Sequence, residues 1–213
     1  PMTVMGLCGR VDRVRIQEIL DYSTYPGSYE PMGLGDPMDQ KAILENPRAL
    51  IFAWGHTIHM IADAIGVELE ELDTIWEKWP TPEPIEFPHG VIEPGRCAAV
   101  RFEIRRFVGG EPRIIVEHCN RITDAAAPHW PRGKLEENDV YRVTIEGSPN
   151  IVQETTFRGE QEGDPNAGTC LSTGMRAIHA IPAVCAAPPG LLSALDLPLV
   201  PGRGNMHRHG SRV

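Results

Sequence analysis

The stretch from Arg96 to Arg121, RCAAVRFEIRRFVGGEPRIIVEHCNR, decides the fold. In its first half the apolar residues Val100, Phe102 and Ile104 alternate with charged residues, which is the period-two pattern of a half-buried strand. A second apolar run follows Gly109-Gly110. Two such runs joined by a glycine turn predict a β-hairpin.

Further strands are predicted on both sides of this hairpin. Residues 11–22 (VDRVRIQEILDY) alternate between apolar and polar side chains with roughly the period of a strand. Residues 140–147 and 151–157 form a second predicted hairpin around Ser148-Pro149-Asn150. Five strands are therefore expected, most of them linked as hairpins.

Helices are predicted between these strands. Asn46-Pro47 begins one of them, because Asn46 fits an N-cap and proline is favoured at the first helical position, and this helix ends at Gly66. Residues 68–76 are expected to continue as a short helix. Residues 164–187 form a long helical segment that a proline interrupts.

Together these elements predict an α+β fold with a largely antiparallel, mixed sheet and helices packed on one face. The chain has 213 residues, of which 41% are hydrophobic, and this suffices for one large domain with its own core. We expect that domain to span residues 1–201. A basic, flexible tail is expected at residues 202–213.

The composition excludes several classes of protein. A net charge of −9 argues against a nucleic-acid-binding protein, which would show a basic face. No apolar run approaches the ~20 residues that span a bilayer, and no export leader is seen, so a membrane protein is not expected. The 5 cysteines form no C-x-x-C pair, which indicates free thiols and no metal site in a cytoplasmic protein.

Complete catalytic motifs are also missing from the sequence. Neither Gly33-Leu34-Gly35 nor Gly202-Arg203-Gly204 lies between a strand and a helix, as a dinucleotide-binding fingerprint requires. A phosphate-binding loop is absent. Ser172-Thr173-Gly174 follows Cys170, where a nucleophile elbow needs glycine. The sequence therefore predicts no self-standing catalytic centre.

Polar side chains where the first strand runs into a long loop suggest a binding site. Tyr22 and Tyr25 lie at this point, next to a Pro/Gly-rich loop over residues 25–37, and such clusters commonly line pockets. A capped strand end with locally bonded hydroxyls is the alternative. On the next helix, Trp54 and His56 flank Gly55, which lets a ligand or another backbone approach closely.

Other histidines are weaker candidates. His56 and His59 have a spacing that can hold a metal, but no third ligand is evident. Glu117 and His118 are neighbours on a strand and point to opposite faces, so they are not a catalytic pair. His179 precedes a helix-breaking proline, which either presents it to a ligand or marks a packing kink.

Four short motifs carry a resemblance to a known family. They are the AIPAVCAAPPGLL run within His179–Leu199, Gly55-His56, the E-P-G-R stretch at Glu93–Arg96, and the I-E-G-x-P turn at Ile145–Pro149. Read with the opening GLCGRVDRVRIQEILDYS, the chain resembles the C-terminal domain of the dihydrodipicolinate-reductase-like oxidoreductases. That family includes 2,4-diaminopentanoate dehydrogenase and the native amine dehydrogenases, here of actinobacterial type.

The resemblance implies a two-domain enzyme. Its N-terminal Rossmann domain, absent from this sequence, holds NAD or NADP, and the C-terminal domain supplies the substrate pocket and homodimer contacts. This chain alone is then expected to bind no cofactor and to be inactive. The reaction implied is hydride transfer to or from a small carbonyl, imine or amine substrate. No catalytic base is assigned, because the resemblance places the proton-handling carboxylate in the N-terminal part.

The chain also departs from the family pattern. Dihydrodipicolinate reductases carry a His-His pair and a lysine where this chain has Asp21-Tyr22-Ser23, so reduction of dihydrodipicolinate is not expected. His179 stands where the family has asparagine. We therefore predict a pocket wall made by five residues: Tyr22, Tyr25, Trp54, His56 and His179.

Two other functions remain open at this stage. A stand-alone dimeric module that binds a small ligand without catalysis would also lack the motifs above. A hydrolase that uses Cys170 or Cys185 with His179 is a third option, but no orienting residue supports it.

Overall fold

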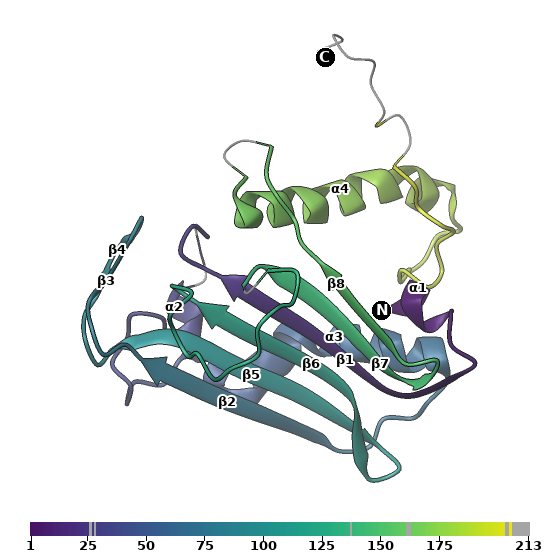
Figure 1. Ribbon diagram of the computed structural model, residues 1–213. Helices are drawn as coiled ribbons and strands as arrows, with labels where there is room; N and C mark the ends of the chain where they lie inside the picture. The colour runs from purple at the N-terminus through teal and green to yellow at the C-terminus, as the bar shows by residue number, and fades with distance from the viewer. Residues whose placement is uncertain (26, 28, 137, 161–162, 203–204, 206–213) are drawn as a thin grey trace.

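A mixed sheet of six strands, in the order β2-β5-β6-β1-β7-β8, forms the centre of the protein (Figure 1). The computed structural model describes residues 1–25, 27, 29–136, 138–160, 163–202 and 205. The strands of the sheet are β1 (Arg10–Asp21), β2 (Leu72–Pro80), β5 (Cys97–Val108), β6 (Glu111–Arg121), β7 (Val140–Ser148) and β8 (Ile151–Thr155). A separate hairpin consists of β3 (Ile85–Phe87) and β4 (Gly90–Ile92).

β1 is a central strand that pairs along both of its edges. It runs parallel to β6 and antiparallel to β7, and every other pairing between the described strands is antiparallel. The register places Glu18 of β1 opposite His118 of β6 and opposite Tyr141 of β7. The predicted α+β fold with a largely antiparallel, mixed sheet is confirmed.

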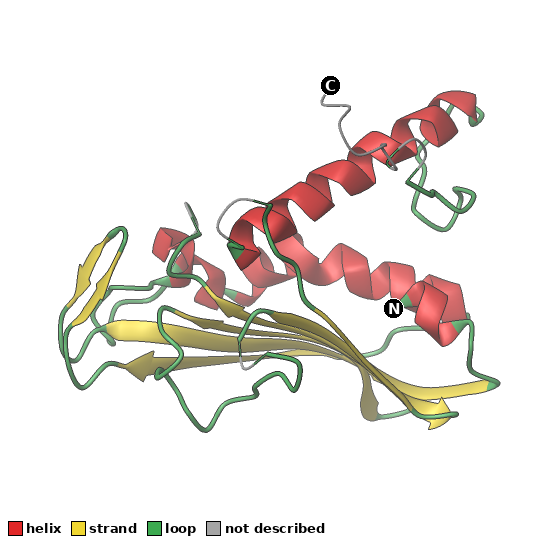
Figure 2. Ribbon diagram, turned by 45° about the horizontal axis from the view of Figure 1, so that its top comes forward, coloured by secondary structure: helices red, strands yellow, loops and turns green. Residues whose placement is uncertain are grey.

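The helices lie on one side of the sheet (Figure 2). They are α1 (Met2–Met5), α2 (Tyr29–Met32), a 3-10 turn (Ile43–Glu45), α3 (Pro47–Ile65) and α4 (Pro165–Ala186). α3 begins and ends as predicted, because the Asn46 side chain accepts a hydrogen bond from the Arg48 N–H and Gly66 adopts a left-handed φ of 69°. In the described part of the chain, no helix has the length and apolar content needed to cross a membrane.

The hydrophobic core fills the space between α3 and the sheet. Ile58 and Ile61 of α3 are fully buried in one cluster with Phe102, Ile104 and Val116 of the sheet. Burial of each such side chain contributes roughly 1.5–3 kcal/mol, so this single layer holds α3 on the sheet.

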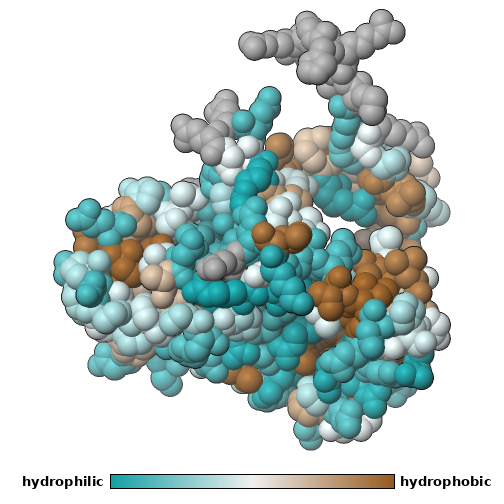
Figure 3. Space-filling model, viewed as in Figure 1, coloured by the Kyte–Doolittle hydropathy of each residue, from teal (hydrophilic) through white to brown (hydrophobic). Residues whose placement is uncertain are grey.

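The opposite face of the sheet carries charged side chains that pair with one another. Glu117, whose side chain is only 1% exposed, lies 2.5 Å from Arg15 Nη1 and 2.7 Å from Arg101 Nε. Burial raises the pKa of Glu117, but hydrogen bonds and charge from Arg101 and Arg15 outweigh it and keep the pKa below its ordinary value. Glu103 contacts the same two arginines. Much of this face is hydrophilic (Figure 3).

A fully buried arginine organises the long connection between β6 and β7. The Arg121 guanidinium donates hydrogen bonds of 3.0 Å to the carbonyl oxygens of Ala126 and Pro131 and to Asn138 Oδ1. Burial is the main cause that lowers the pKa of Arg121. These bonds hold residues 122–136 and Asn138 against the end of the sheet.

The prediction of a short helix over residues 68–76 is wrong. Leu72–Pro80 forms β2 instead and pairs along its length with β5. Its Thr-Ile-Trp run is β-branched and aromatic, and the Trp76 ring stacks on Phe102 with centroids 5.4 Å apart. The expected five strands are also too few, because β2, β3 and β4 are missing from them. The predicted loop over 25–37 contains α2.

The predicted basic tail is almost entirely outside the described residues. Within 202–213, only Gly202 and Asn205 are described. The expected boundary between a domain and a flexible tail therefore stays a prediction.

The first testable consequence concerns Arg121. Arg121→Lys should lower the free energy of unfolding by about 3 kcal/mol, because a single ammonium cannot reach all the acceptors of the buried guanidinium. Urea denaturation measures this loss. Arg48→Lys, at an exposed position on α3, is the matched control and should change stability by less than about 0.5 kcal/mol. Equal effects of the two substitutions would show that the connection does not depend on Arg121.

Candidate functional site

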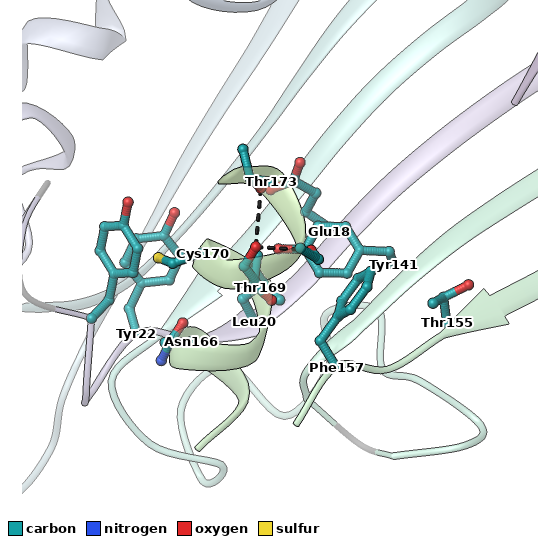
Figure 4. Close-up of a pocket in the computed structure, with 12 residues that line it drawn as sticks. Glu18, Leu20, Tyr22, Tyr141, Thr155, Phe157, Asn166, Thr169, Cys170 and Thr173 are labelled. Carbon is teal, nitrogen blue, oxygen red and sulfur yellow. Dashed lines mark hydrogen bonds between the residues drawn. The ribbon is translucent and has the colours of Figure 1, made fainter. Parts of the chain in front are cut away.

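A pocket of about 590 Å³ opens between the end of β1, the β7–β8 edge and the first turns of α4. Figure 4 shows the side chains that surround it. They are mostly aromatic or small and polar, with one carboxylate: Glu18, Leu20, Tyr22, Tyr25, Tyr141, Thr155, Phe157, Asn166, Thr169, Cys170, Ser172 and Thr173. This volume suits a small organic ligand.

The strand alternation of β1 supplies one wall. Glu18 and Leu20 are two residues apart, so both point to the face of the sheet that carries the helices, and Tyr22 continues this series just beyond the strand. Tyr141 of β7 lies directly opposite Glu18 in register. The pocket wall is therefore set by the pairing of β1 with β7.

The start of α4 is fixed to the end of β1 by a small hydrogen-bond network. Asp164 caps the helix, because its side chain accepts bonds from the N–H groups of Asn166 and Ala167. The Asn166 side chain donates to the Asp21 carbonyl at 2.9 Å and to Thr24 Oγ1 at 2.7 Å. Thr24 Oγ1 in turn donates to Asp164 at 2.8 Å. These bonds hold the α4 wall of the pocket in place.

A glycine in the first turns of α4 lets the loop after β8 pass close by. A Cβ at Gly168 would lie 2.6 Å from the Arg158 carbonyl carbon, so a side chain at this position would displace the backbone. One turn further on, the hydroxyls of Ser172 and Thr173 donate to the Thr169 carbonyl (Figure 4). These two hydroxyls are thus engaged within the helix.

Two pairs of aromatic rings flank the pocket. The centroids of Tyr22 and Tyr25 are 5.1 Å apart, and those of Tyr141 and Phe157 are 5.4 Å apart in an edge-on arrangement. Burial, with a further contribution from the charge of Glu18, raises the pKa of both Tyr22 and Tyr141. Both phenols therefore stay neutral at physiological pH and can act as hydrogen-bond donors.

Glu18 lies next to a buried histidine of the neighbouring strand β6. Its Oε2 lies 3.3 Å from Nδ1 of His118, which is fully buried, and the His118 ring stacks on Phe102 with centroids 4.5 Å apart. Within the described residues, neither ring nitrogen of His118 makes a hydrogen bond of good geometry. Burial lowers the pKa of His118 despite the nearby carboxylates, so the ring is neutral.

Acidic side chains gather just outside the pocket. Asp139 has a positive φ of 84°, and its Oδ1 accepts a hydrogen bond from the Asp21 N–H at 3.2 Å. Burial, together with the charges of Asp21, Asp124 and Asp164, raises the pKa of Asp139 to about 6. Among the described residues, no group of three or more candidate ligands is arranged to hold a metal ion.

The structure brings two of the five predicted site residues together. Tyr22 and Tyr25 line the pocket. Trp54 packs in the core, with its ring 4.8 Å from His118 and 5.0 Å from Phe102.

The other two predicted residues lie elsewhere. His56 is exposed on α3. His179 lines a separate groove of about 330 Å³ between α4 and the segment around Pro198, and its Nε2 is 3.2 Å from Asn205 Nδ2. Cys170 and His179 are thus in different depressions. A role for Trp54, His56 or His179 stays a prediction.

The sequence analysis missed several residues of the pocket. Glu18, Tyr141 and Asn166 were not among the candidates, and Cys170 was considered only as the nucleophile of a hydrolase, not as part of the pocket wall. Strand alternation alone would have placed Glu18 on the same face as Tyr22, and this signal was available. The contributions of β7 and α4 required knowledge of the strand order, which local patterns do not contain.

The described residues lack the topology of a Rossmann-type dinucleotide-binding fold. Its binding fold links two parallel strands through a helix that starts at a glycine-rich turn. The only parallel pair in the described sheet, β1 and β6, is connected through four other strands and the helices α2 and α3. The described residues therefore do not form a Rossmann-type dinucleotide-binding fold.

These features define an α+β domain with a ligand-sized pocket at the end of its central strand and no dinucleotide fold in its described part. The chain belongs to the family described as the 2,4-diaminopentanoate dehydrogenase C-terminal domain, whose model matches residues 2–209. This confirms the resemblance seen in the sequence. It also makes the chain a C-terminal domain of an oxidoreductase family.

Individual relatives agree with this assignment. The chain is 37% identical over 217 residues to an amine dehydrogenase of Streptomyces virginiae, a match that covers 99% of this chain and 59% of that protein. It is 26% identical over 198 residues to a 2,4-diaminopentanoate dehydrogenase of Acetoanaerobium sticklandii, covering 91% and 52% respectively. The chain thus spans somewhat more than half the length of these relatives.

One solved structure shares the fold. The amine dehydrogenase from Mycobacterium smegmatis matches with a TM-score of 0.65 at 18% identity, over 95% of this chain and 55% of that one. The part of each relative without a counterpart here is large enough for a further domain.

The raised pKa of Asp139 gives a pH-dependent prediction. Because the folded state binds this proton more tightly, its contribution to stability is present below about pH 4 and is lost as the pH rises through about 6. Asp139→Asn keeps the acceptor oxygen and tolerates the positive φ. It should therefore stabilise the protein above pH 7 by about 1 kcal/mol, a value discounted for partial exposure. Thermal denaturation between about pH 4 and 8 measures the difference.

Asp39→Asn is the matched control, because Asp39 is exposed and far from this cluster in sequence. It removes the same charge at an exposed position and should change the stability by less than about 0.5 kcal/mol. A pH-independent effect of Asp139→Asn would show that the proton is not bound at Asp139.

Proposed function

We propose that this chain is the substrate-binding and dimerisation part of an NAD(P)-dependent oxidoreductase that acts on a small amine, or on its carbonyl or imine partner. The observation that carries the proposal is the pocket at the end of β1, in a chain that belongs to a dehydrogenase family. The role of this part is to bind and orient the substrate for hydride transfer.

The residues of the pocket support an orienting role. Tyr22 and Tyr141 are neutral phenols with raised pKa, and each can donate a hydrogen bond to a carbonyl, imine or amine nitrogen or oxygen. The aromatic pairs give the ligand an apolar surface on both sides. Because the described residues do not form a Rossmann-type fold, we expect the nicotinamide to come from another part of the protein.

The outer surface of α4 supports the presence of such a part. Ile178, Ile181 and Val184 are each about half exposed, and Leu191 and Leu199 after the helix are almost fully exposed. Exposed apolar groups of this kind mark surfaces that another domain covers. We assign this surface to the N-terminal domain that the relatives' greater length implies.

Cysteine labelling tests whether the pocket binds the proposed ligands. Cys170 lines the pocket, and Cys185 is exposed on the same helix outside it. Saturating 2-aminopentane or pentan-2-one should slow the alkylation of Cys170 by iodoacetamide at least about threefold, because the ligand covers the thiol. Peptide mass spectrometry measures both rates. The rate at Cys185 should be unchanged, and equal rates at Cys170 with and without ligand would contradict the assignment.

Nucleotide binding gives a second test, which asks whether the cofactor is bound outside this chain. Titration of this 213-residue chain with NADH or NADPH should leave the nicotinamide fluorescence unchanged, since no dinucleotide fold is present in the described residues. A dehydrogenase with a known dinucleotide site serves as the positive control. Micromolar binding by this chain would overturn the proposal that the cofactor is held elsewhere.

A further inference from the structure

The pocket contains one carboxylate, and no lysine, arginine or histidine is among the described residues that line it. We propose that Glu18 is a specificity-determining residue that binds a cationic nitrogen of the ligand. This inference rests on the proposed function, because it takes the pocket as the substrate site. It goes further by naming the residue that selects the charge of the substrate.

Glu18 differs from the other shielded carboxylates of the sheet. Glu117 and Glu103 each contact Arg15 and Arg101, and Glu154 contacts Arg142. Arginine thus neutralises every one of these groups. Glu18 has a side chain that is 30% exposed, yet within the described residues it makes no ion pair with lysine or arginine. Its charge is left available to a ligand.

His118 does not supply the missing positive charge. The ring is buried between Trp54 and Phe102, where its charged form would be poorly solvated. Nδ1 of the neutral His118 ring lies 3.3 Å from Glu18 Oε2. The ring occupies space on that side of the carboxylate but does not cancel its charge. His118 therefore does not compete with a ligand for the charge of Glu18, and Glu18 presents its charge towards the pocket (Figure 4).

The aromatic walls favour the same ligand chemistry. Tyr22, Tyr25, Tyr141 and Phe157 surround the space next to Glu18, and the faces of such rings attract cations. An ammonium group gains from both the carboxylate and the rings. A ligand carboxylate would meet the negative charge of Glu18 with no cation nearby to offset it. The substrate class that fits is therefore a small amine without a carboxylate.

Three probes of equal chain length test this inference on the 213-residue protein: n-pentylamine, 1-pentanol and pentanoate. At about pH 7.5 the amine is an ammonium ion, the alcohol is neutral and the acid is an anion. We expect the amine to bind about tenfold or more tightly than the alcohol, and pentanoate to bind more weakly than either. Ligand-observed NMR titration measures all three dissociation constants.

Glu18→Gln keeps the shape of the side chain and removes its charge. It should weaken amine binding about tenfold and leave 1-pentanol binding within about twofold. Glu86→Gln, at an exposed position on β3, changes the net charge equally and should have no effect on either. Circular dichroism checks that each variant is folded. If Glu18→Gln does not fold, the relative affinities of the three probes for the unmodified protein test whether the pocket prefers a cationic nitrogen.

The outcomes separate this inference from the function on which it rests. Equal affinity for amine and alcohol, unchanged by Glu18→Gln, would overturn the role of Glu18 and leave the pocket as a binding site. Failure of all three probes to bind, together with unprotected Cys170, would overturn the pocket assignment itself.

Discussion

The burial of Glu117 under two arginines from different strands is the interaction on which the sheet depends. Arg15 comes from β1 and Arg101 from β5, and both reach the same carboxylate of β6. An unpaired carboxylate at this position would cost several kcal/mol, so the three strands are tied to one alignment. A slip of β1 by one residue would carry Arg15 to the other face and leave Glu117 without one of its two partners.

The same alignment creates the pocket. Because Arg15 lies on the charged face, the residues in alternate positions, such as Glu18 and Leu20, must face the helices. Parallel pairing with β6 then places His118 on one side of Glu18, and antiparallel pairing with β7 places Tyr141 on its other side. The charged face and the candidate site are therefore two consequences of a single register.

Much of this fold could be predicted from the sequence, because the relevant signals are local. The alternation in Arg96–Arg121 and the cap at Asn46 each need only a few neighbouring residues to act. β2 could not be predicted in this way, because its conformation depends on pairing with β5 and on the contact of Trp76 with Phe102. Only part of the pocket wall could be predicted from the sequence. Tyr22 and Tyr25 follow from the end of a strand, whereas Cys170 comes from a helix far away in the sequence.

The two faces of the sheet differ in how their shielded carboxylates are paired. This difference distinguishes the carboxylates that hold strands together from Glu18, which we propose binds a ligand. On one face Glu103, Glu117 and Glu154 each contact an arginine, so their charges stabilise the alignment of the strands. On the other face Glu18 has a neutral histidine and tyrosines, which shield it from water without neutralising it. Within the described residues Glu18 makes no ion pair with lysine or arginine, so its charge does not contribute to holding the strands together. Under the proposed function, a cationic nitrogen of the substrate would be the partner that this carboxylate lacks.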